Sequence, residues 1–464
     1  MLMNSYFIVT YLFQIATLHD ILFSVMSIKN LKLDNILQAI KKDKRWIILI
    51  VMFSFFIFLR FYQIDSKSIF MYDQVDSAWA AKRILVDHNF PLIGPANRLG
   101  SGLFVGPLYY YLISPFYFMT GLDPIAAPLF AGFTAILTFF TTFYITKKIF
   151  SFNTALIAIG IYTISAHGIA FDRVQWEINF IPIVSLLTFF SIYKIIKGNE
   201  KFSILLALAL GFAFHTHLTI AIFLPLITLF SSAFFPKTKK MLIYSFFSFL
   251  MFLLFLLPII IANFTIDNSL FHSSFSYANT TFHGLHLQRI LQLKNDAFIE
   301  IGSFLFLPYL SELKLFLVPI FFIVYLKTAR AQNKSSTESV LDKLAFCFLV
   351  FLWFVIPWLV LSTYAGEITN YYFSINFPIA LFILAYLMEK LLYSKNRIIL
   401  ILCILFISYY SFLNLKTFFN SRAIGINLRR EGVKDVIKKG GVIHFKEGNP
   451  EAYIYYVYSR FPFR

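Results

Sequence analysis

Two aspartates stand three residues apart in a long polar segment that follows a strongly apolar stretch of the chain. They are Asp73 and Asp76, in the run Tyr-Asp-Gln-Val-Asp-Ser-Ala-Trp. In a helix this spacing places both carboxylates on neighbouring positions of one turn. An aspartate has a reference pKa of about 3.9, so at neutral pH it can accept a proton from a hydroxyl held beside it. Asp73 is therefore the candidate catalytic base; the alternative is a solvated helix start with Asp73 as its cap or first-turn acid.

Other polar and aromatic side chains that could bind a phosphate or a sugar are spread over distant segments. They are Asp76, Tyr109, Tyr110, Arg173, His215, His217, Arg289, Tyr371 and Tyr372. Arginine binds phosphate through charge-assisted hydrogen bonds. Each group also has a structural interpretation: the tyrosines could belong to the aromatic belt, the two histidines to a turn, and the loop around Arg289 to a lid without a fixed role.

Asp172 and Glu177 are the candidate metal ligands, in a short segment where Arg173 could face a phosphate. The alternative is an interfacial cap with Trp176 in the aromatic belt. His215 and His217 form a weak zinc pattern, since residues two apart cannot share a helix face and no cysteine or third histidine is nearby. No cofactor is established by the sequence, and a divalent metal ion is the candidate.

The composition is that of an integral membrane protein. The chain has 464 residues, of which 59% are hydrophobic and 14% charged, whereas soluble domains carry about 25% charged residues. The net charge of +17 does not indicate nucleic acid, because the basic residues sit in short clusters between apolar runs, as at the cytoplasmic ends of membrane helices. Cys347 and Cys403 fall inside predicted spans and indicate neither a disulfide nor a metal site.

The apolar runs predict an all-α polytopic membrane protein with about eleven transmembrane helices, each needing about 20 residues. The expected spans are 46–64, 123–146, 152–170, 178–196, 202–216, 218–235, 241–262, 312–327, 344–362, 373–391 and 398–414. Residues 1–40 are either an interfacial helix or an additional span. The expected divisions are an N-terminal cytoplasmic or interfacial segment 1–45, a transmembrane catalytic domain 46–414 and an extracytoplasmic tail 415–464.

Basic clusters occupy every second connection between the predicted spans, which places all of them, together with Lys41 to Arg45, on the cytoplasmic side. The opposite face then receives a large first loop, 65–122, whose residues 78–85 form an amphipathic helix along the membrane surface. It also receives the other connections that carry candidate residues, and the tail. The sequence of the tail predicts a small α/β-like unit, with a helix near 429–439 and a strand-like run at 442–445.

These motifs, in this order, resemble the GT-C superfamily of polytopic glycosyltransferases. The likeness is greatest to the family-39-like branch related to protein O-mannosyltransferases and to the aminoarabinose transferase of lipid A. The residues that carry it are Asp73-Gln74 with Ala78 to Leu85, Pro91 to Pro95, Gly106 to Tyr111, Asp172-Arg173 with Trp176, His215 to Thr219, and Tyr371-Tyr372 with Pro378.

The resemblance implies an inverting glycosyltransferase in the plasma (inner) membrane, with its active site on the extracytoplasmic side. It implies a sugar on a polyprenyl phosphate as donor, a lipid, glycan or protein as acceptor, and Asp73 as base. The chain departs from the family at three places. Gln74 stands where many relatives have a second acid, Asp76-Ser77 where the most similar loops have Arg-Asp, and Asn370 where a histidine is frequent. These departures bear on the role of Asp76 and on a metal site.

Two other classes of function fit a polytopic chain. One is a transporter or flippase for a lipid or polysaccharide, which ionisable residues in the middle of spans would favour. The other is a glycan polymerase or ligase, which a lipid-linked oligosaccharide acceptor would favour. Most charges here lie toward one membrane face and few interrupt the spans, which favours chemistry at the surface on a lipid-linked substrate.

Overall fold

The computed structural model describes residues 43–96, 103–266, 270–282, 284–305, 312–332, 340–421, 423–446 and 448–460. The chain forms two compact units, Met1–Phe58 and Leu59–Arg464. Residues 1–40, predicted as an interfacial or spanning segment, lie outside the described ranges. Within those ranges the regular structure is helical, with two isolated β-bridges and no strand.

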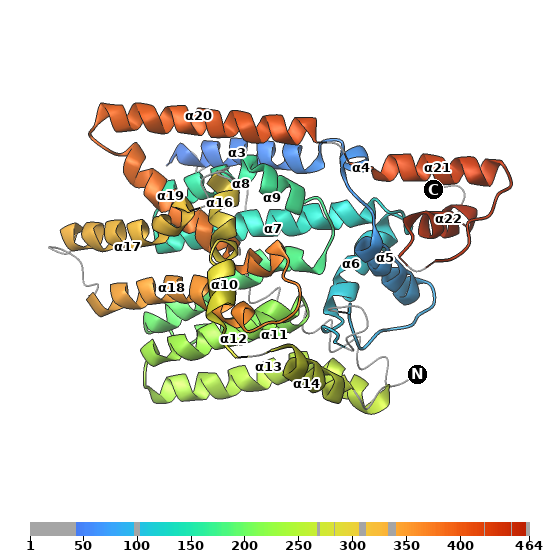
Figure 1. Cartoon of the computed structure of the whole chain (residues 1–464), viewed down its shortest axis with the longest axis horizontal. Coiled ribbons are helices and arrows are strands. Elements are labelled where there is room, and N and C mark those ends of the chain that lie inside the picture. Colours follow the sequence, from blue (N-terminus) through green and yellow to red (C-terminus); the bar gives the residue numbers. More distant parts are fainter. Residues whose placement is uncertain are drawn as a thin grey trace. The chain divides into compact units, whose positions relative to one another are not determined.

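The helices follow one another through the chain as Figure 1 shows. The first half contains α3 (Arg45–Phe61), α4 (Ile64–Lys67), α5 (Tyr72–Leu85), α6 (Leu108–Met119), α7 (Ala126–Ile149), α8 (Phe152–Ile164), α9 (Ala166–Phe171), η2 (Glu177–Phe180), α10 (Ile181–Ile196), α11 (Phe202–Phe214), α12 (Leu218–Ser231) and η3 (Ser232–Phe234). The second half contains α13 (Lys239–Thr265), α14 (Leu270–Thr281), α15 (Leu287–Gln292), η4 (Asp296–Phe298), α16 (Ile299–Leu305), α17 (Leu313–Gln332), α18 (Val340–Ser362), η5 (Asn370–Asn376), α19 (Phe377–Leu392), α20 (Arg397–Asn420), α21 (Ile426–Lys438) and α22 (Pro450–Arg460).

The prediction of an all-helical, polytopic membrane protein is confirmed. Six helical segments in the described ranges are long and apolar enough to cross a membrane: Ala126–Ile149, Glu177–Ile196, Lys239–Thr265, Leu341–Ser362, Asn370–Leu392 and Arg397–Asn420. Shorter apolar helices are Phe152–Ile164, Phe202–Phe214 and Leu218–Phe234. The total of eleven spans stays a prediction. The expected span 152–170 is divided at Ser165, and α20 runs six residues past the expected end at 414.

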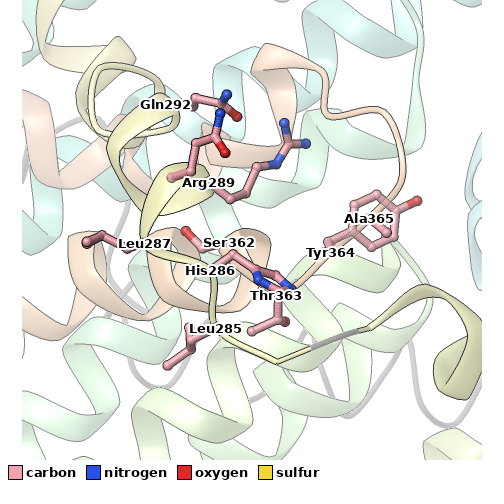
Figure 2. A pocket seen from close by; sticks show the side chains of 10 residues that line it. Leu285, His286, Leu287, Arg289, Gln292, Ser362, Thr363, Tyr364 and Ala365 are labelled. Carbon is pink, nitrogen blue, oxygen red and sulfur yellow. The ribbon is translucent and has the colours of Figure 1, made fainter.

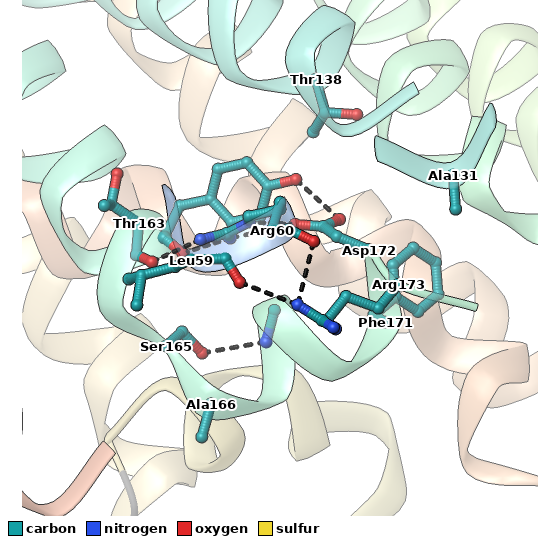
Figure 3. A network of polar contacts seen from close by, with 12 residues as sticks. Leu59, Arg60, Ala131, Thr138, Thr163, Ser165, Ala166, Phe171, Asp172 and Arg173 are labelled. Atoms are coloured by element: carbon teal, nitrogen blue, oxygen red, sulfur yellow. Dashed lines mark hydrogen bonds and ion pairs between the residues drawn. The ribbon is translucent and has the colours of Figure 1, made fainter. Parts of the chain in front are cut away.

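The break at Ser165 is tied to a buried arginine. Ser165 adopts an extended backbone and its Oγ accepts a hydrogen bond from the Gly168 amide at 3.1 Å, which caps α9. The last carbonyls of α8 therefore have no partner within their own helix. Arg60 donates to two of them, that of Thr163 and, at 2.9 Å, that of Tyr162 (Figure 3). The guanidinium thus replaces the hydrogen bonds that the break removes.

The same arginine is paired with Asp172, directly after α9. Arg60 Nε donates to Asp172 Oδ2 at 3.0 Å, and the Tyr162 hydroxyl donates to Asp172 Oδ1 at 2.8 Å. Arg60 and Asp172 are both buried. Arg173 donates in turn to the carbonyls of Leu59 and Arg60 (Figure 3). It also donates to the Gln63 carbonyl, and together these bonds cap the C-terminal end of α3. These contacts fix the segment that precedes η2.

The tail packs on the first loop and on the turn that follows α6. Trp79 of α5 contacts the rings of Tyr453 and Tyr456 in α22, with centroids 5.1 and 5.0 Å away. The Tyr453 hydroxyl donates to the Leu122 carbonyl at 2.8 Å, and Arg430 of α21 pairs with Asp123.

The strand expected at Val442 to Phe445 is wrong, and with it the α/β character of the tail. The described tail residues after 420 form α21, α22 and an irregular connection between them. An extended segment becomes a strand only when a second strand supplies its hydrogen bonds. Here an apolar residue of this segment packs against α5 instead: the rings of Phe445 and Trp79 have centroids 5.5 Å apart.

Replacing Arg60 by alanine removes the guanidinium and leaves Asp172 buried without its counter-charge. Breaking a buried ion pair from one side lowers the free energy of unfolding by about 3–5 kcal/mol. We therefore expect a large drop in the melting temperature of the detergent-solubilised Arg60→Ala protein. Lys439→Ala is the control, because it breaks an exposed pair with Asp435 and should change stability by less than about 1 kcal/mol. Equal melting temperatures for the two variants would contradict a supporting role for Arg60.

Candidate active site

The start of α5 is held against the segment that precedes η2. Gln74 is buried and makes two hydrogen bonds in opposite directions. Its Oε1 accepts from the Met71 amide at 3.0 Å, which closes the N-terminus of the helix, and its Nε2 donates to the Gln175 carbonyl at 2.7 Å. The Gln74 amide thus positions the helix that carries Asp73.

Asp73 is the exposed carboxylate of this helix start. It accepts no hydrogen bond from any residue in the ranges that the structure describes. Desolvation by the surrounding protein, and in second place the negative charge of Asp76, raise the pKa of Asp73 above its ordinary value. A raised pKa makes a carboxylate a stronger proton acceptor when it is ionised.

Asp76 differs from Asp73 in having a partner in the protein. The Tyr110 hydroxyl donates to Asp76 Oδ2 at 2.6 Å. Burial, followed by the charge of Asp76, raises the pKa of Tyr110, so this hydroxyl stays protonated and remains a donor. Tyr110 therefore holds the Asp76 carboxylate toward α6.

Tyr109 is buried on the neighbouring side of α6. Its hydroxyl accepts a hydrogen bond from Gln175 Nε2 at 2.7 Å, and Tyr117 donates to Gln175 Oε1 at 3.1 Å. The Gln175 amide is thus enclosed by two tyrosines while its backbone carbonyl receives Gln74. Tyr109 belongs to the support of the site rather than to its open surface.

An aromatic cluster adjoins these carboxylates and includes both tyrosines of η5. The rings of Trp176 and Tyr371 lie 4.9 Å apart, and His217 lies 5.5 Å from Tyr371 and 5.6 Å from Tyr372. Asp73 and Glu177 are within electrostatic range of the Tyr371 hydroxyl. The structure therefore brings five predicted site residues into one neighbourhood: Asp73, Asp76, Tyr110, Glu177 and Tyr371.

The two histidines of the turn between α11 and α12 have separate roles. His217 caps α12, its Nδ1 accepting from the Thr219 amide at 3.3 Å, and its ring faces the aromatic cluster. His215 lies between the first loop and α13: its Nδ1 accepts from the Leu108 amide at 3.3 Å and its Nε2 lies 2.8 Å from the Phe255 carbonyl. A Cβ added to Gly106 would approach the His215 ring to 2.0 Å, so glycine is needed there.

Neither histidine is positively charged at neutral pH. Burial lowers the pKa of both His215 and His217 to about 4. His215 donates through Nε2 and accepts through Nδ1, which is the neutral tautomer that its two backbone partners require. It positions the start of α6 and supplies no charge for a phosphate.

The two arginines predicted to bind phosphate lie apart from the carboxylates. Arg173 donates through Nη1 and Nη2 to backbone carbonyls at the end of α3. Arg289 lines a separate polar cavity of about 580 Å³ with His286 and Tyr364 (Figure 2). It donates to the Gly366 carbonyl at 3.3 Å. Arg289 is thus the predicted arginine that faces an open cavity.

The metal site stays a prediction, and the observed contacts do not favour Asp172 as a ligand. Both Asp172 oxygens already accept hydrogen bonds, from Arg60 and Tyr162. No group of three or more His, Cys, Asp or Glu side chains suited to an ion occurs in the described part of the chain. Glu177 lies instead beside Asp73 and Asp76, as a third carboxylate.

Sequence reasoning missed Arg83, an exposed cation on α5. It follows Asp76 by seven residues, two helical turns, and therefore shares its face. Its charge acts on the Tyr110 hydroxyl, so it lies near the Asp76 pair. Arg83 forms no ion pair with any residue described here. The seven-residue spacing within the amphipathic segment was the available signal.

No protein-family model matches the sequence, and comparison with curated proteins finds no relative. Solved structures do match. ArnT from Cupriavidus metallidurans bound to undecaprenyl phosphate has a TM-score of 0.52 and 10% identity, over 88% of this chain and 74% of that chain. The apo state of the same ArnT has a TM-score of 0.49, with 10% identity over the same shares. Archaeal oligosaccharyltransferase AglB from Archaeoglobus fulgidus, in complex with an inhibitory peptide and a dolichol-phosphate, has a TM-score of 0.47 and 11% identity, over 86% and 58%.

The fold and the site define a polytopic membrane protein with a carboxylate cluster carried by its first large loop. The fold is that of the ArnT structure, which confirms the predicted resemblance to the GT-C enzymes at the level of the fold. An identity of 10% carries the likeness no further than the fold.

The lowered pKa values of His215 and His217 predict how stability depends on pH. An unfolded histidine binds a proton below about pH 6.5, whereas the folded protein keeps both neutral until about pH 4. The unfolded state then binds more protons, so the free energy of unfolding falls as the pH drops from 6.5 toward 4. The slope is up to about 1.4 kcal/mol per pH unit for each histidine. In thermal melts at a series of pH values, His217→Gln should flatten this slope, whereas His444→Gln, at an exposed tail position, should retain it. An unchanged slope in His217→Gln would refute burial as the cause.

Proposed function

We propose that this protein is an inverting glycosyltransferase that moves a sugar from a polyprenyl phosphate to a hydroxyl acceptor. The observation that carries the proposal is the state of Asp73. This carboxylate is exposed and accepts no hydrogen bond within the described ranges, while Asp76 and Asp172 are both engaged by protein donors. A general base must have an oxygen available for the substrate. The ArnT-like fold supports the same class of reaction.

The reaction is a single displacement at the anomeric carbon of the donor sugar. The acceptor oxygen forms a bond to this carbon while Asp73 takes the hydroxyl proton. The bond from the anomeric carbon to the phosphate oxygen breaks, and its electron pair leaves with the polyprenyl phosphate. Because the acceptor attacks opposite the leaving group, the anomeric configuration is inverted.

The developing charge on the departing phosphate needs a fixed cation. Arg173 and the neutral His215 and His217 are used elsewhere, so among the predicted and exposed arginines of the described ranges we consider Arg83 and Arg289 for this role. Arg83 is exposed beside the Asp76–Tyr110 pair, and Arg289 lines the polar cavity of Figure 2. We assign the phosphate to one of these two arginines and the acceptor hydroxyl to Asp73.

The buried charges do not favour the transporter or flippase alternative. The Asp172 carboxylate is bonded to Arg60 and Tyr162, and that of Glu389 accepts from Ser151 and Thr154 at 2.7 and 2.6 Å. These two carboxylates are bonded within the protein and support the structure, so they do not point to a transport path. We therefore place the chemistry at the extracytoplasmic face of the plasma membrane, with a lipid, glycan or protein as acceptor.

Asp73→Asn should abolish transfer while the protein stays folded in the membrane. Asparagine keeps the shape of the side chain but cannot accept the acceptor proton, and loss of a general base lowers rates by about 100- to 10,000-fold. The measurement is transfer of label from a panel of radiolabelled polyprenyl-phosphate sugars in isolated membranes. Asp87→Asn is the matched control, since Asp87 follows the same helix, is exposed and pairs with Lys82. Near-normal transfer by Asp73→Asn would rule out the assignment of the base.

The pH–rate profile separates Asp73 from other carboxylates. Protonated Asp73 cannot act as a base, so kcat/KM should fall as the pH drops through its raised pKa, above the range of an ordinary aspartate. Asp76→Asn removes the like charge that contributes to this raised pKa. The acid limb of the profile should therefore move to lower pH in that variant. An acid limb at the same pH in wild type and Asp76→Asn would show that Asp73 does not control it.

A further inference from the structure

A second cavity, with a largely apolar lining that includes several polar side chains, adjoins the aromatic cluster and is separate from the one that contains Arg289. It has a volume of about 560 Å³, within the range of small-molecule sites. Three elements supply its lining: α9, α16 and the start of η5. The lining residues are His167, Phe171, Ile299, Glu300, Ser303, Thr369, Asn370, Tyr371 and Ser374. Tyr371 belongs both to this lining and to the cluster beside Asp73.

The cavity contains a buried carboxylate that is paired with a histidine. The Glu300 side chain is 3% exposed, and His167 Nε2 lies 3.2 Å from its Oε2. This ion pair is the contact of Oε2 in the described part of the chain, where that oxygen accepts no well-aligned hydrogen bond. The buried Thr369 Oγ1 has no hydrogen-bond partner among the described residues. A buried polar group without a partner is costly, and polar atoms facing a cavity are satisfied when a ligand donates to them.

The lining indicates what kind of molecule would fit. A carboxylate disfavours a phosphate and accepts hydrogen bonds from hydroxyl groups, which are short and strong when the acceptor is charged. The hydroxyls of Ser303, Thr369 and Ser374 can both donate and accept. The rings of Phe171 and Tyr371 offer flat apolar surfaces on which the C–H face of a sugar ring can pack. A compact ring bearing several hydroxyls matches this combination.

We propose that this cavity is a sugar-binding subsite in which Glu300 accepts hydrogen bonds from the hydroxyls of a pyranose or furanose ring. The choice of a sugar rests on the proposed function, and the shared residue Tyr371 joins the subsite to the Asp73 neighbourhood. The sugar belongs either to the donor or to a glycan acceptor. Glu300, Asn370 and Tyr371 determine which ring is held.

Binding can be measured without turnover. The purified full-length protein is titrated with methyl glycosides of common hexoses, pentoses and amino sugars, and tryptophan fluorescence is followed. Trp176 is a natural reporter, because its ring lies 4.9 Å from that of Tyr371; Trp176→Phe identifies its share of the signal. At least one glycoside should bind saturably to the wild type and to Asp73→Asn alike.

Glu300→Gln should weaken this binding at least tenfold, because it replaces charge-assisted hydrogen bonds by neutral ones. Glu389→Gln is the matched control, a buried glutamate whose carboxylate is satisfied by Ser151 and Thr154, and it should bind as the wild type does. Asn370→Ala is a second test at an exposed position of the lining, where folding is not at stake, and it should also weaken binding. The proposal is overturned if no glycoside binds saturably, or if Glu300→Gln and Asn370→Ala both keep wild-type affinity.

Transfer assays identify the source of the sugar and keep the two proposals apart. In Glu300→Gln, a raised KM for the polyprenyl-phosphate sugar assigns the subsite to the donor, and a raised KM for the acceptor assigns it to the acceptor. Normal transfer by Asp73→Asn together with loss of sugar binding in Glu300→Gln would reject the catalytic assignment and retain the subsite. Loss of transfer in Asp73→Asn with unchanged sugar affinity in both cavity variants would do the reverse.

Discussion

The buried pair between Arg60 and Asp172 is the contact on which the geometry of the site depends. An arginine side chain cannot be neutralised by losing its proton, so once buried it must find acceptors for its donors. The break between α8 and α9 provides two backbone carbonyls and Asp172 provides a carboxylate. Satisfying this one guanidinium fixes where α8 ends and how the chain leaves α9. The next residues, Gln175 to Glu177, are consequently held where α5 can bond to them.

Three aspartates of the same chain show how hydrogen bonding separates structural from chemical roles. Asp172 is saturated by buried donors and supports the fold. Asp76 accepts from a tyrosine and is held in place, yet its charge still acts on its neighbour. Asp73 accepts nothing from the described residues and is open to solvent. Residue type makes all three candidates for catalysis, and their partners distinguish them.

The sequence was sufficient for the features that depend on local pattern. Apolar runs and basic clusters predicted a polytopic helical protein, and the polar first loop predicted a helix at 78–85, which the structure extends back to Tyr72 so that it includes Asp73. Contacts between distant segments could not be read in this way. Arg173 and His215 looked like phosphate ligands because their partners, the end of α3 and the backbone at Leu108, are remote in sequence. Glu300 was missed because only the approach of α9 and η5 to α16 gives its carboxylate a cavity. The apolar run at Val442 resembled a strand because its contact with Trp79 is also long-range.

The distribution of charge favours one orientation of the donor in the proposed reaction. Asp73, Asp76 and Glu177 act on one another electrostatically, so an anionic phosphate placed among them would be repelled. The exposed Arg83 and the cavity with Arg289 offer the opposite sign. A donor that puts its phosphate toward a cation and its anomeric carbon toward Asp73 would direct its leaving group away from the base, as inverting displacement requires. The pKa of Asp73 is raised by desolvation and then by the charge of Asp76, and this same negative charge would also orient the substrate.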